Sequence, residues 1–196
     1  MQTAPARAEL DEVTLARAQR GDAVATRALV ERYQRPVFAL LARMLLGRAE
    51  VEDLAQETFM RVFTALPRFD RAGSAKLSTW ILTIASRVAL DQLARHAPAV
   101  RDVRDVRDPS DLAAIPARAA DGADVGADRS ALRRALEAAV AALPPAFRAA
   151  FLLREYHGLE YDEIARALDI ELGTVRSRLA RARAELRANL AEVHHG

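Results

Sequence analysis

The chain has 196 residues, no cysteine and a formal charge of +2 at neutral pH. The length allows one large or two small domains, and the absence of cysteine excludes disulfides, thiolate zinc sites and cysteine nucleophiles. The small net charge means that any surface for nucleic acid is local. Without a signal segment or an apolar run of membrane-spanning length, we expect a cytoplasmic protein that does not insert into a membrane. Without a phosphate-binding glycine loop, a nucleophile elbow or a metalloprotease motif, we expect no enzymatic activity, cofactor or metal site.

Helical periodicity dominates the chain, and no stretch alternates like a strand for long enough to build a sheet. We therefore predict an all-α fold with two small helical domains joined by a flexible linker. The predicted boundaries are residues 10–96 for the first domain, 97–129 for the linker and 130–190 for the second. The linker is rich in proline, glycine and Arg-Asp repeats, and its composition cannot bury a core.

The first domain begins with two predicted helices separated by a turn. Residues 11–19 form a short helix, Gly21 breaks it, and Asp22 is the expected N-cap of the next. Pro36 is expected to kink or interrupt that second helix, because proline removes a backbone donor and clashes with the preceding turn. A third helix follows over residues 49–66.

This third helix carries a polar row opposite its apolar face. The row is spaced at i, i+3, i+4 and i+7 and consists of Asp53, Gln56, Glu57 and Met60. Such a row is either solvated surface or a docking strip for a basic helix of another protein, since exposed methionine is an adaptable contact and acids select partners by charge. On periodicity alone, solvated surface is the favoured interpretation.

A basic loop and a fourth helix complete the first domain. The loop covers residues 68–76 and carries three cations against Asp70, and the helix covers residues 78–95 with the only tryptophan, Trp80, at its start. A lone tryptophan is usually a core residue, although an aromatic ring beside a basic loop can also wedge against an unstacked base. One side of this helix is a polar stripe formed by Thr79, Thr83, Ser86 and Arg87.

The second domain begins with two predicted helices. Ser130 is the expected N-cap of the first, which runs to Leu143, and a second covers residues 146–156 and ends at Gly158. The residues of the first helix expected to face a core are Leu132, Leu136, Val140 and Leu143.

Residues 160–186 have the spacing of a helix-turn-helix. The second helix of the pair is expected to begin near Gly173 or Thr174. Asp169 occupies the turn position where glycine is usual, and aspartate tolerates a left-handed backbone better than most residues. The buried positions are expected to be Tyr161, Ile164, Ala165 and Leu168 on the first helix and Val175, Leu179, Ala182 and Leu186 on the second.

The second helix of the pair has a one-sided basic surface. Arg176, Ser177, Ala180, Arg181 and Ala184 lie opposite its apolar row, and Arg178, Arg183 and Arg187 flank it. Guanidinium groups bond base edges or phosphates, and small neighbours let a helix approach the major groove closely. A solvated helical hairpin is the alternative, but spacing, turn length and charge together favour DNA binding.

Taken together, these segments resemble the extracytoplasmic-function (ECF) sigma factors of bacterial RNA polymerase. The resemblance extends from about Asp11 to Leu190. It rests on EDLAQETFMRVF (52–63), STWILTIASRVALDQLAR (78–95), LPPAFRAAFLLREYHGLEYDEIARAL (143–168) and GTVRSRLARAR (173–183), in this order.

The resemblance assigns roles to the surfaces described above. The row Asp53, Gln56, Glu57 and Met60 would dock on the clamp helices of the largest subunit of core RNA polymerase, and the flap is a further expected contact. The residues implied for the melted minus-ten element are Arg71, Lys76, Thr79, Trp80, Thr83, Ser86 and Arg87. Those implied for the minus-thirty-five duplex are Arg154, Thr174, Arg176, Ser177, Arg178, Ala180, Arg181 and Arg183.

Further expectations follow from the same resemblance. The partners would be core polymerase, promoter DNA and an anti-sigma factor, and the free protein would be a monomer. Arg87 stands where the family often has Asn, and Leu77 stands where an aromatic residue is common, so these two positions bear on minus-ten preference. Because neither half carries enough charge for tight duplex binding, we expect the free protein to bind promoters poorly and the holoenzyme to bind them well. A stand-alone helix-turn-helix transcriptional regulator is the alternative function.

Overall fold

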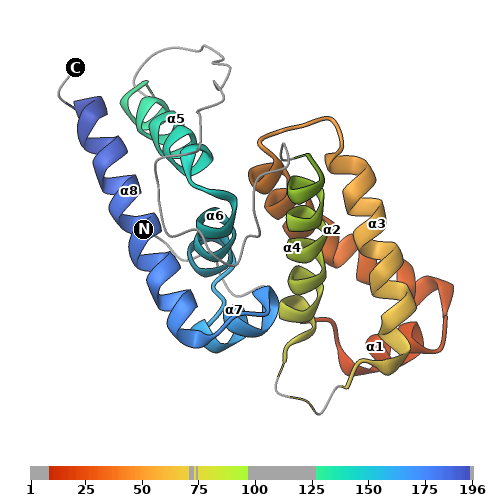
Figure 1. Ribbon diagram of the computed structural model, residues 1–196. Helices are drawn as coiled ribbons and strands as arrows, with labels where there is room; N and C mark the ends of the chain where they lie inside the picture. Colours follow the sequence, from red (N-terminus) through yellow and green to blue (C-terminus); the bar gives the residue numbers. More distant parts are fainter. Residues whose placement is uncertain (1–8, 71–72, 74, 97–126, 195–196) are drawn as a thin grey trace.

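The computed structural model describes residues 9–70, 73, 75–96 and 127–194, with the side chains of residues 127–131 and 192–194 left out. The described residues form helices and helical turns and contain no strand, which confirms the predicted all-α fold (Figure 1). Most of the predicted linker, residues 97–126, lies outside the described residues. The fold is therefore described as an N-terminal half before this segment and a C-terminal half after it.

The N-terminal half contains four α-helices. They are α1 (Glu12–Gln19), α2 (Ala23–Leu45), α3 (Val51–Ala65) and α4 (Leu77–His96), with a 3-10 turn at Leu66–Arg68 after α3. Asp11 and Asp22 cap α1 and α2 by accepting hydrogen bonds from the amides of Thr14 and Ala25, both at 2.9 Å. The first helix, the second N-cap and the break at Gly21 (φ 82°) agree with the sequence prediction.

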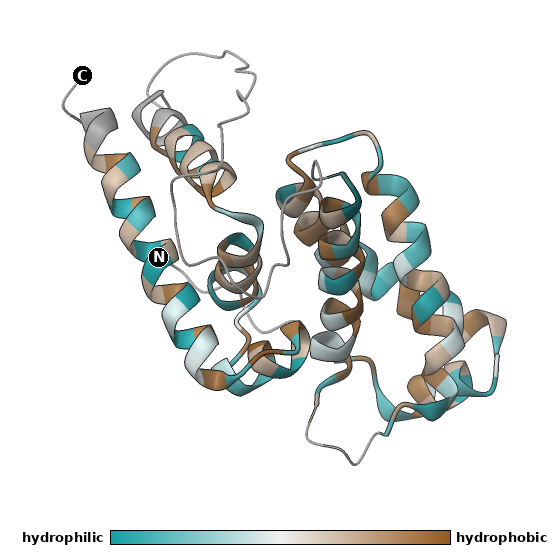
Figure 2. Ribbon diagram, in the orientation of Figure 1, coloured by the Kyte–Doolittle hydropathy of each residue, from teal (hydrophilic) through white to brown (hydrophobic). Residues whose placement is uncertain are grey.

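The C-terminal half contains α5 (Ala127–Ala142), α6 (Pro145–Phe151), a π-helical segment (Leu152–Tyr156), α7 (Tyr161–Leu168) and α8 (Leu172–His194). α7 and α8 are the predicted helix-turn-helix pair, with α8 beginning one residue earlier than expected. Figure 2 shows hydrophilic and hydrophobic residues recurring along α3 and α8, as in helices with one buried side.

Three local expectations from the sequence differ from the structure. α2 continues without interruption through Pro36, because the residues after it, including the fully buried Val37, anchor the helix in the core. α5 begins at Ala127, so Ser130 lies inside the helix and not at its cap. Leu132 is 56% exposed, and the buried side chains among the described ones of α5, such as Val140, lie in its second half.

The two halves pack against each other. α7 lies against α4, and α6 contacts both α4 and α2. In Figure 1, α7 lies beside the N-terminal end of α4, far from α3. This packing leaves the outer side of α3 open and covers one side of α4.

Candidate functional site

The predicted polar row lies on the open side of α3. Asp53 and Gln56 are exposed, and Met60 keeps 70% of its surface exposed. Glu57 is half-buried and pairs with Arg61 one turn further along the helix. The buried residues of α3 lie on the opposite side, so the sequence placed this row correctly on the solvent side of the helix.

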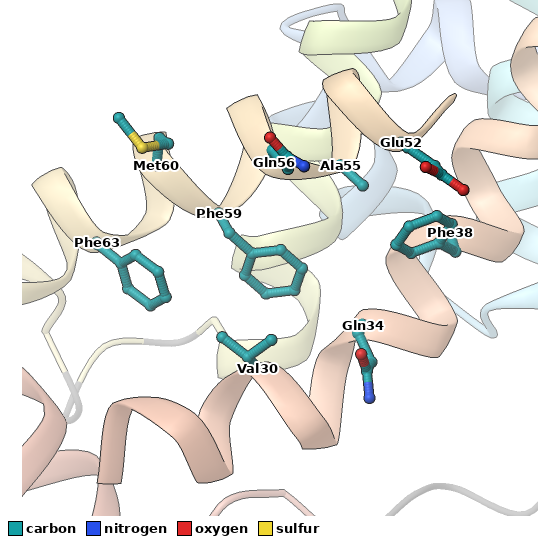
Figure 3. A pocket seen from close by; sticks show the side chains of 9 residues that line it. All are labelled: Val30, Gln34, Phe38, Glu52, Ala55, Gln56, Phe59, Met60 and Phe63. Atoms are coloured by element: carbon teal, nitrogen blue, oxygen red, sulfur yellow. The ribbon is translucent and has the colours of Figure 1, made fainter. Parts of the chain in front are cut away.

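An open apolar groove runs beside this row, between α2 and α3. Its volume is about 470 Å³, and Figure 3 shows side chains from both helices lining it. Phe38 on α2 is 38% exposed at this groove. The lining residues are Val30, Gln34, Phe38, Glu52, Ala55, Gln56, Phe59, Met60 and Phe63. Sequence periodicity predicted that Phe59 and Phe63 lie on the buried face of α3. The groove is formed by α2 and α3 together, so it is seen only once the two helices are placed side by side.

Two residues of the polar stripe of α4 are buried in this structure, and Arg87 is exposed. Thr79 is 6% exposed, Ser86 is fully buried, and Thr83 is half-buried. Ser86 and Thr83 donate hydrogen bonds to carbonyls one turn earlier in α4, at Leu82 and Thr79. Helical spacing identified the stripe as polar but could not identify what packs on it.

Two residues of the stripe bond to α7. The Thr79 hydroxyl donates to Oε1 of Glu163 at 2.9 Å. The Arg87 guanidinium donates to the carbonyls of Ala167 and Arg166 at 3.3 and 3.2 Å. These carbonyls belong to the last turn of α7, where backbone acceptors lack helical partners. Residues implied for the minus-ten element therefore lie at the contact between the two halves.

Trp80 and the basic loop complete this region. The Trp80 ring is half-buried and lies 5.0 Å from the ring of Phe69, so it packs against the core as the commoner interpretation predicted. Lys76 is exposed. Arg71 lies outside the described residues.

α8 has the predicted division into faces. All four residues expected to be buried are buried, with exposed fractions of 6% or less: Val175, Leu179, Ala182 and Leu186. The exposed residues include Arg176, Ser177, Ala180 and Arg181. Thr174 is half-buried, and its carbonyl accepts a hydrogen bond from the Ser177 hydroxyl at 3.0 Å. The surface of α8 thus combines exposed guanidinium groups with small side chains.

Three other arginines of this half are either partly buried or paired with an acid. Arg178 is half-buried, and burial lowers the pKa of its guanidinium. Arg154 pairs with Glu160 at 2.9 Å, and Arg183 pairs with Glu155 at 2.8 Å. The hydrogen bond from Arg183 to Glu155 raises the pKa of that arginine. Arg154 and Arg183 therefore each share their charge with an acidic partner of the same half.

Two classes of site have no candidate among the described residues. No group of three histidine or acidic side chains is arranged to hold a metal ion. Among the described helices, none combines the length and the hydropathy that a bilayer span requires.

Comparison with protein families gives two matches that follow the division of the chain. A family model described as Sigma-70 region 2 matches residues 29–98, and one described as Sigma-70, region 4 matches residues 133–186. The RNA polymerase sigma-H factor of Pseudomonas aeruginosa is 36% identical over 184 residues, covering 89% of this chain and 91% of that protein. The ECF RNA polymerase sigma-E factor of Escherichia coli is 33% identical over 175 residues, covering 88% and 90%.

Solved structures share the fold at lower identity. CnrH, solved in complex with the cytosolic domain of CnrY, matches with a TM-score of 0.64 and 24% identity, covering 93% of this chain and 97% of that one. The sigma factor RpoE of Bartonella quintana, solved with the anti-sigma factor NepR, matches with a TM-score of 0.60 and 21% identity, covering 84% and 96%.

Proposed function

The chain belongs to the ECF sigma factors of bacterial RNA polymerase, and we propose that it docks on core polymerase through α3 and reads two promoter elements through α4 and α8. The minus-thirty-five element is read as duplex and the minus-ten element as melted strand. Sigma factors are generally DNA-recognition proteins and not enzymes. This chain supplies binding surfaces, and the polymerase supplies the chemistry of RNA synthesis.

The observation that carries the proposal is the open side of α3. There the exposed Asp53, Gln56 and Met60 lie next to an apolar groove of about 470 Å³. Apolar surface rimmed by polar groups is typical of a protein interaction site. Acidic side chains at the rim favour a basic partner helix, which agrees with docking on the clamp helices of the largest subunit.

The DNA-reading roles are supported by the chemistry of two helices. On α8, exposed Arg176 and Arg181 flank Ala180, which leaves room for the helix in a major groove. On α4, hydroxyl groups and Arg87 lie on one side, next to Trp80, and this combination suits unstacked bases of a single strand. Opening the duplex then draws on binding energy for the melted strand, since unstacking costs only a few kcal/mol per step.

The proposal includes an anti-sigma factor as a second partner. CnrH and RpoE, which share this fold, were both solved as complexes, and the partner of RpoE is the anti-sigma factor NepR. Core polymerase, promoter DNA and this inhibitor are the macromolecules with which the chain assembles.

Affinity for core polymerase tests the docking surface. We expect a variant carrying Asp53→Ala and Glu57→Lys to bind purified core polymerase at least about 10-fold more weakly than the wild type, because a charge of the wrong sign faces a basic helix. Fluorescence anisotropy of the labelled protein, titrated with core polymerase, measures this loss.

The matched control is Glu31→Lys. Glu31 is an exposed acid on α2 that pairs with Arg27, so the substitution makes the same kind of charge reversal outside the groove. We expect its affinity to equal that of the wild type. Equal affinity of all three proteins would contradict docking through α3.

A further inference from the structure

Residues 9–19 are bonded to both ends of the segment that joins α3 to α4. Glu9, which precedes α1, bonds to Ser78 in the first turn of α4. Gln19, the last residue of α1, bonds to Leu66 and Phe69 after the end of α3. In Figure 1, α1 lies beside the end of α3 from which the chain leads to α4. The N-terminal segment therefore contacts the approach to α4 from two sides.

Glu9 acts on the N-terminal end of α4. Its Oε2 accepts a hydrogen bond from the Ser78 amide at 3.2 Å, and its Oε1 accepts one from the Ser78 hydroxyl. The first amides of an α-helix have no carbonyl partner within the helix, and a carboxylate is favourable at this positive end. Glu9 thus serves α4 as a capping side chain, although it lies 69 residues earlier in the sequence.

Tyr33 on α2 connects Glu9 to the core. Its side chain is 5% exposed, and its hydroxyl donates to Oε2 of Glu9 at 2.9 Å and accepts the Leu10 amide at 3.1 Å. Burial raises the pKa of Tyr33, and the negative charge of Glu9 adds to the effect. The hydroxyl therefore keeps its proton at neutral pH and remains a donor to Glu9, so a buried residue fixes the position of the cap.

Gln19 acts on the other end of the segment. Its Nε2 donates to the carbonyl of Leu66 at 3.1 Å and to the carbonyl of Phe69 at 2.8 Å. A side-chain amide nitrogen carries two hydrogens, so both bonds form at the same time. α1 also packs on α2, which gives this contact a rigid support. Gln19 therefore fixes the direction in which the chain leaves the turn after α3.

The two held positions adjoin a single aromatic contact. The ring of Phe69 lies 5.0 Å from the ring of Trp80, with the two planes tilted by 45°. Phe69 is bonded to Gln19, and Trp80 follows two residues after Ser78, which is bonded to Glu9. The orientation of the Trp80 ring is thus supported from both sides by residues of the N-terminal segment.

We propose that Glu9 and Gln19 are positioning residues for Trp80, and that they hold the Trp80–Phe69 pair in the orientation in which it meets the melted minus-ten strand. The inference rests on the proposed function for the identity of this strand. A ring that is already fixed loses less conformational entropy when a base stacks on it. The matched Sigma-70 region 2 model begins at residue 29, so both positioning residues precede the part of the chain that it covers.

The fluorescence of Trp80 tests the positioning in the free, full-length protein. Trp80 is the only tryptophan of the chain, so its emission reports on this one site. We expect Glu9→Ala and Gln19→Met each to raise the Stern–Volmer constant for quenching by acrylamide at least about twofold, because the ring loses support and opens to solvent. Gln19→Met keeps the length of the side chain and removes both hydrogen bonds.

Two further variants separate positioning from a general loss of structure. Glu9→Gln keeps an oxygen for the Ser78 amide and the Tyr33 hydroxyl, so its quenching should equal that of the wild type. Glu12→Ala is the matched control, because Glu12 is an exposed acid in the first turn of α1. Its quenching should also be unchanged. Circular dichroism confirms that each variant keeps its helices, and if one of the two disruptive variants loses them, the other decides.

Promoter opening in the holoenzyme tests the consequence for the strand. On a promoter used by this sigma factor, permanganate modifies thymines that have become single-stranded. We expect Glu9→Ala and Gln19→Met to bind core polymerase with the affinity of the wild type and to lower this modification by about fivefold or more, because a displaced ring stacks poorly on a base. Glu9→Gln and Glu12→Ala should open the promoter as the wild type does.

The outcomes separate the inference from the proposed function. Unchanged quenching in both Glu9→Ala and Gln19→Met, or an equal rise in Glu12→Ala, would overturn the positioning role. Increased quenching with unchanged promoter opening would overturn its link to the minus-ten strand. If the wild-type holoenzyme opens no promoter, the proposed function is contradicted, while the quenching of the free proteins still decides whether Glu9 and Gln19 position Trp80.

Discussion

Asp169 is the residue on which the geometry of the helix-turn-helix depends. It ends α7 in the left-handed conformation, with φ 54° and ψ 52°, and its amide bonds to the Ala165 carbonyl. The sequence predicted this conformation from the position of the aspartate at a turn where glycine is usual. Aspartate reaches the left-handed region at lower cost than residues with larger or branched side chains.

Substitution at Asp169 measures this backbone strain. We expect Asp169→Ala to be less stable than Asp169→Gly by about 1 kcal/mol, because alanine has a steric clash in the left-handed region that glycine lacks. The wild type should lie between them. Urea unfolding followed by circular dichroism gives the comparison, and equal midpoints for the two variants would show that the turn does not strain the residue.

For single residues, the sequence predicts burial within a domain but not contacts between the two halves. Val175 and Leu179 of α8 were predicted as buried, and both are, because a helical repeat fixes which side of the helix faces its own domain. The same repeat marked Thr79 and Ser86 as polar, yet both are covered. Arg87 was read as a determinant of base preference, and its bonds to α7 carbonyls have no signature in the sequence, since every residue carries a carbonyl.

At the scale of elements, the sequence predicts the fold closely. Start and stop signals such as Asp22 and Gly158 (φ 72°) lie at helix ends in the structure. Pro36 within α2 is an exception, because burial on both sides of it outweighs one lost backbone hydrogen bond. The π-helical segment Leu152–Tyr156 was expected as ordinary α-helix, and periodicity does not distinguish the two over five residues.

The element with the sharpest functional prediction is α8. In the holoenzyme, Arg176→Ala and Arg181→Ala should each weaken binding to a promoter used by this sigma factor by about 10- to 100-fold, because one bidentate contact to a base contributes roughly 1–3 kcal/mol. A filter-binding titration with the promoter fragment measures the loss.

The control on the same helix is Arg187→Ala. Arg187 is exposed but lies beside the proposed reading face and outside the set assigned to the minus-thirty-five element. It should bind the promoter with the affinity and the salt dependence of the wild type, because it makes none of the proposed contacts. If all three variants weaken binding equally, the helix acts through charge and not through base contacts.

At the scale of the whole molecule, the organisation in two helical halves was predictable and the contact between them was not. Composition marked residues 97–129 as unable to bury a core, which separated the halves. The contact between the halves includes single side chains that donate to helix ends, such as Arg148 to the carbonyl of Met44. Neither periodicity nor motif spacing reports on contacts between residues so far apart in the sequence.

The most direct test of the central claim is run-off transcription on a library of genomic fragments, using purified core polymerase with and without this protein. We expect discrete new transcripts that require the protein and that disappear with the Asp53→Ala and Glu57→Lys variant. If no transcripts appear while the free protein binds particular duplex sites tightly at physiological salt, the chain acts as a stand-alone helix-turn-helix regulator and the account given for polymerase is contradicted.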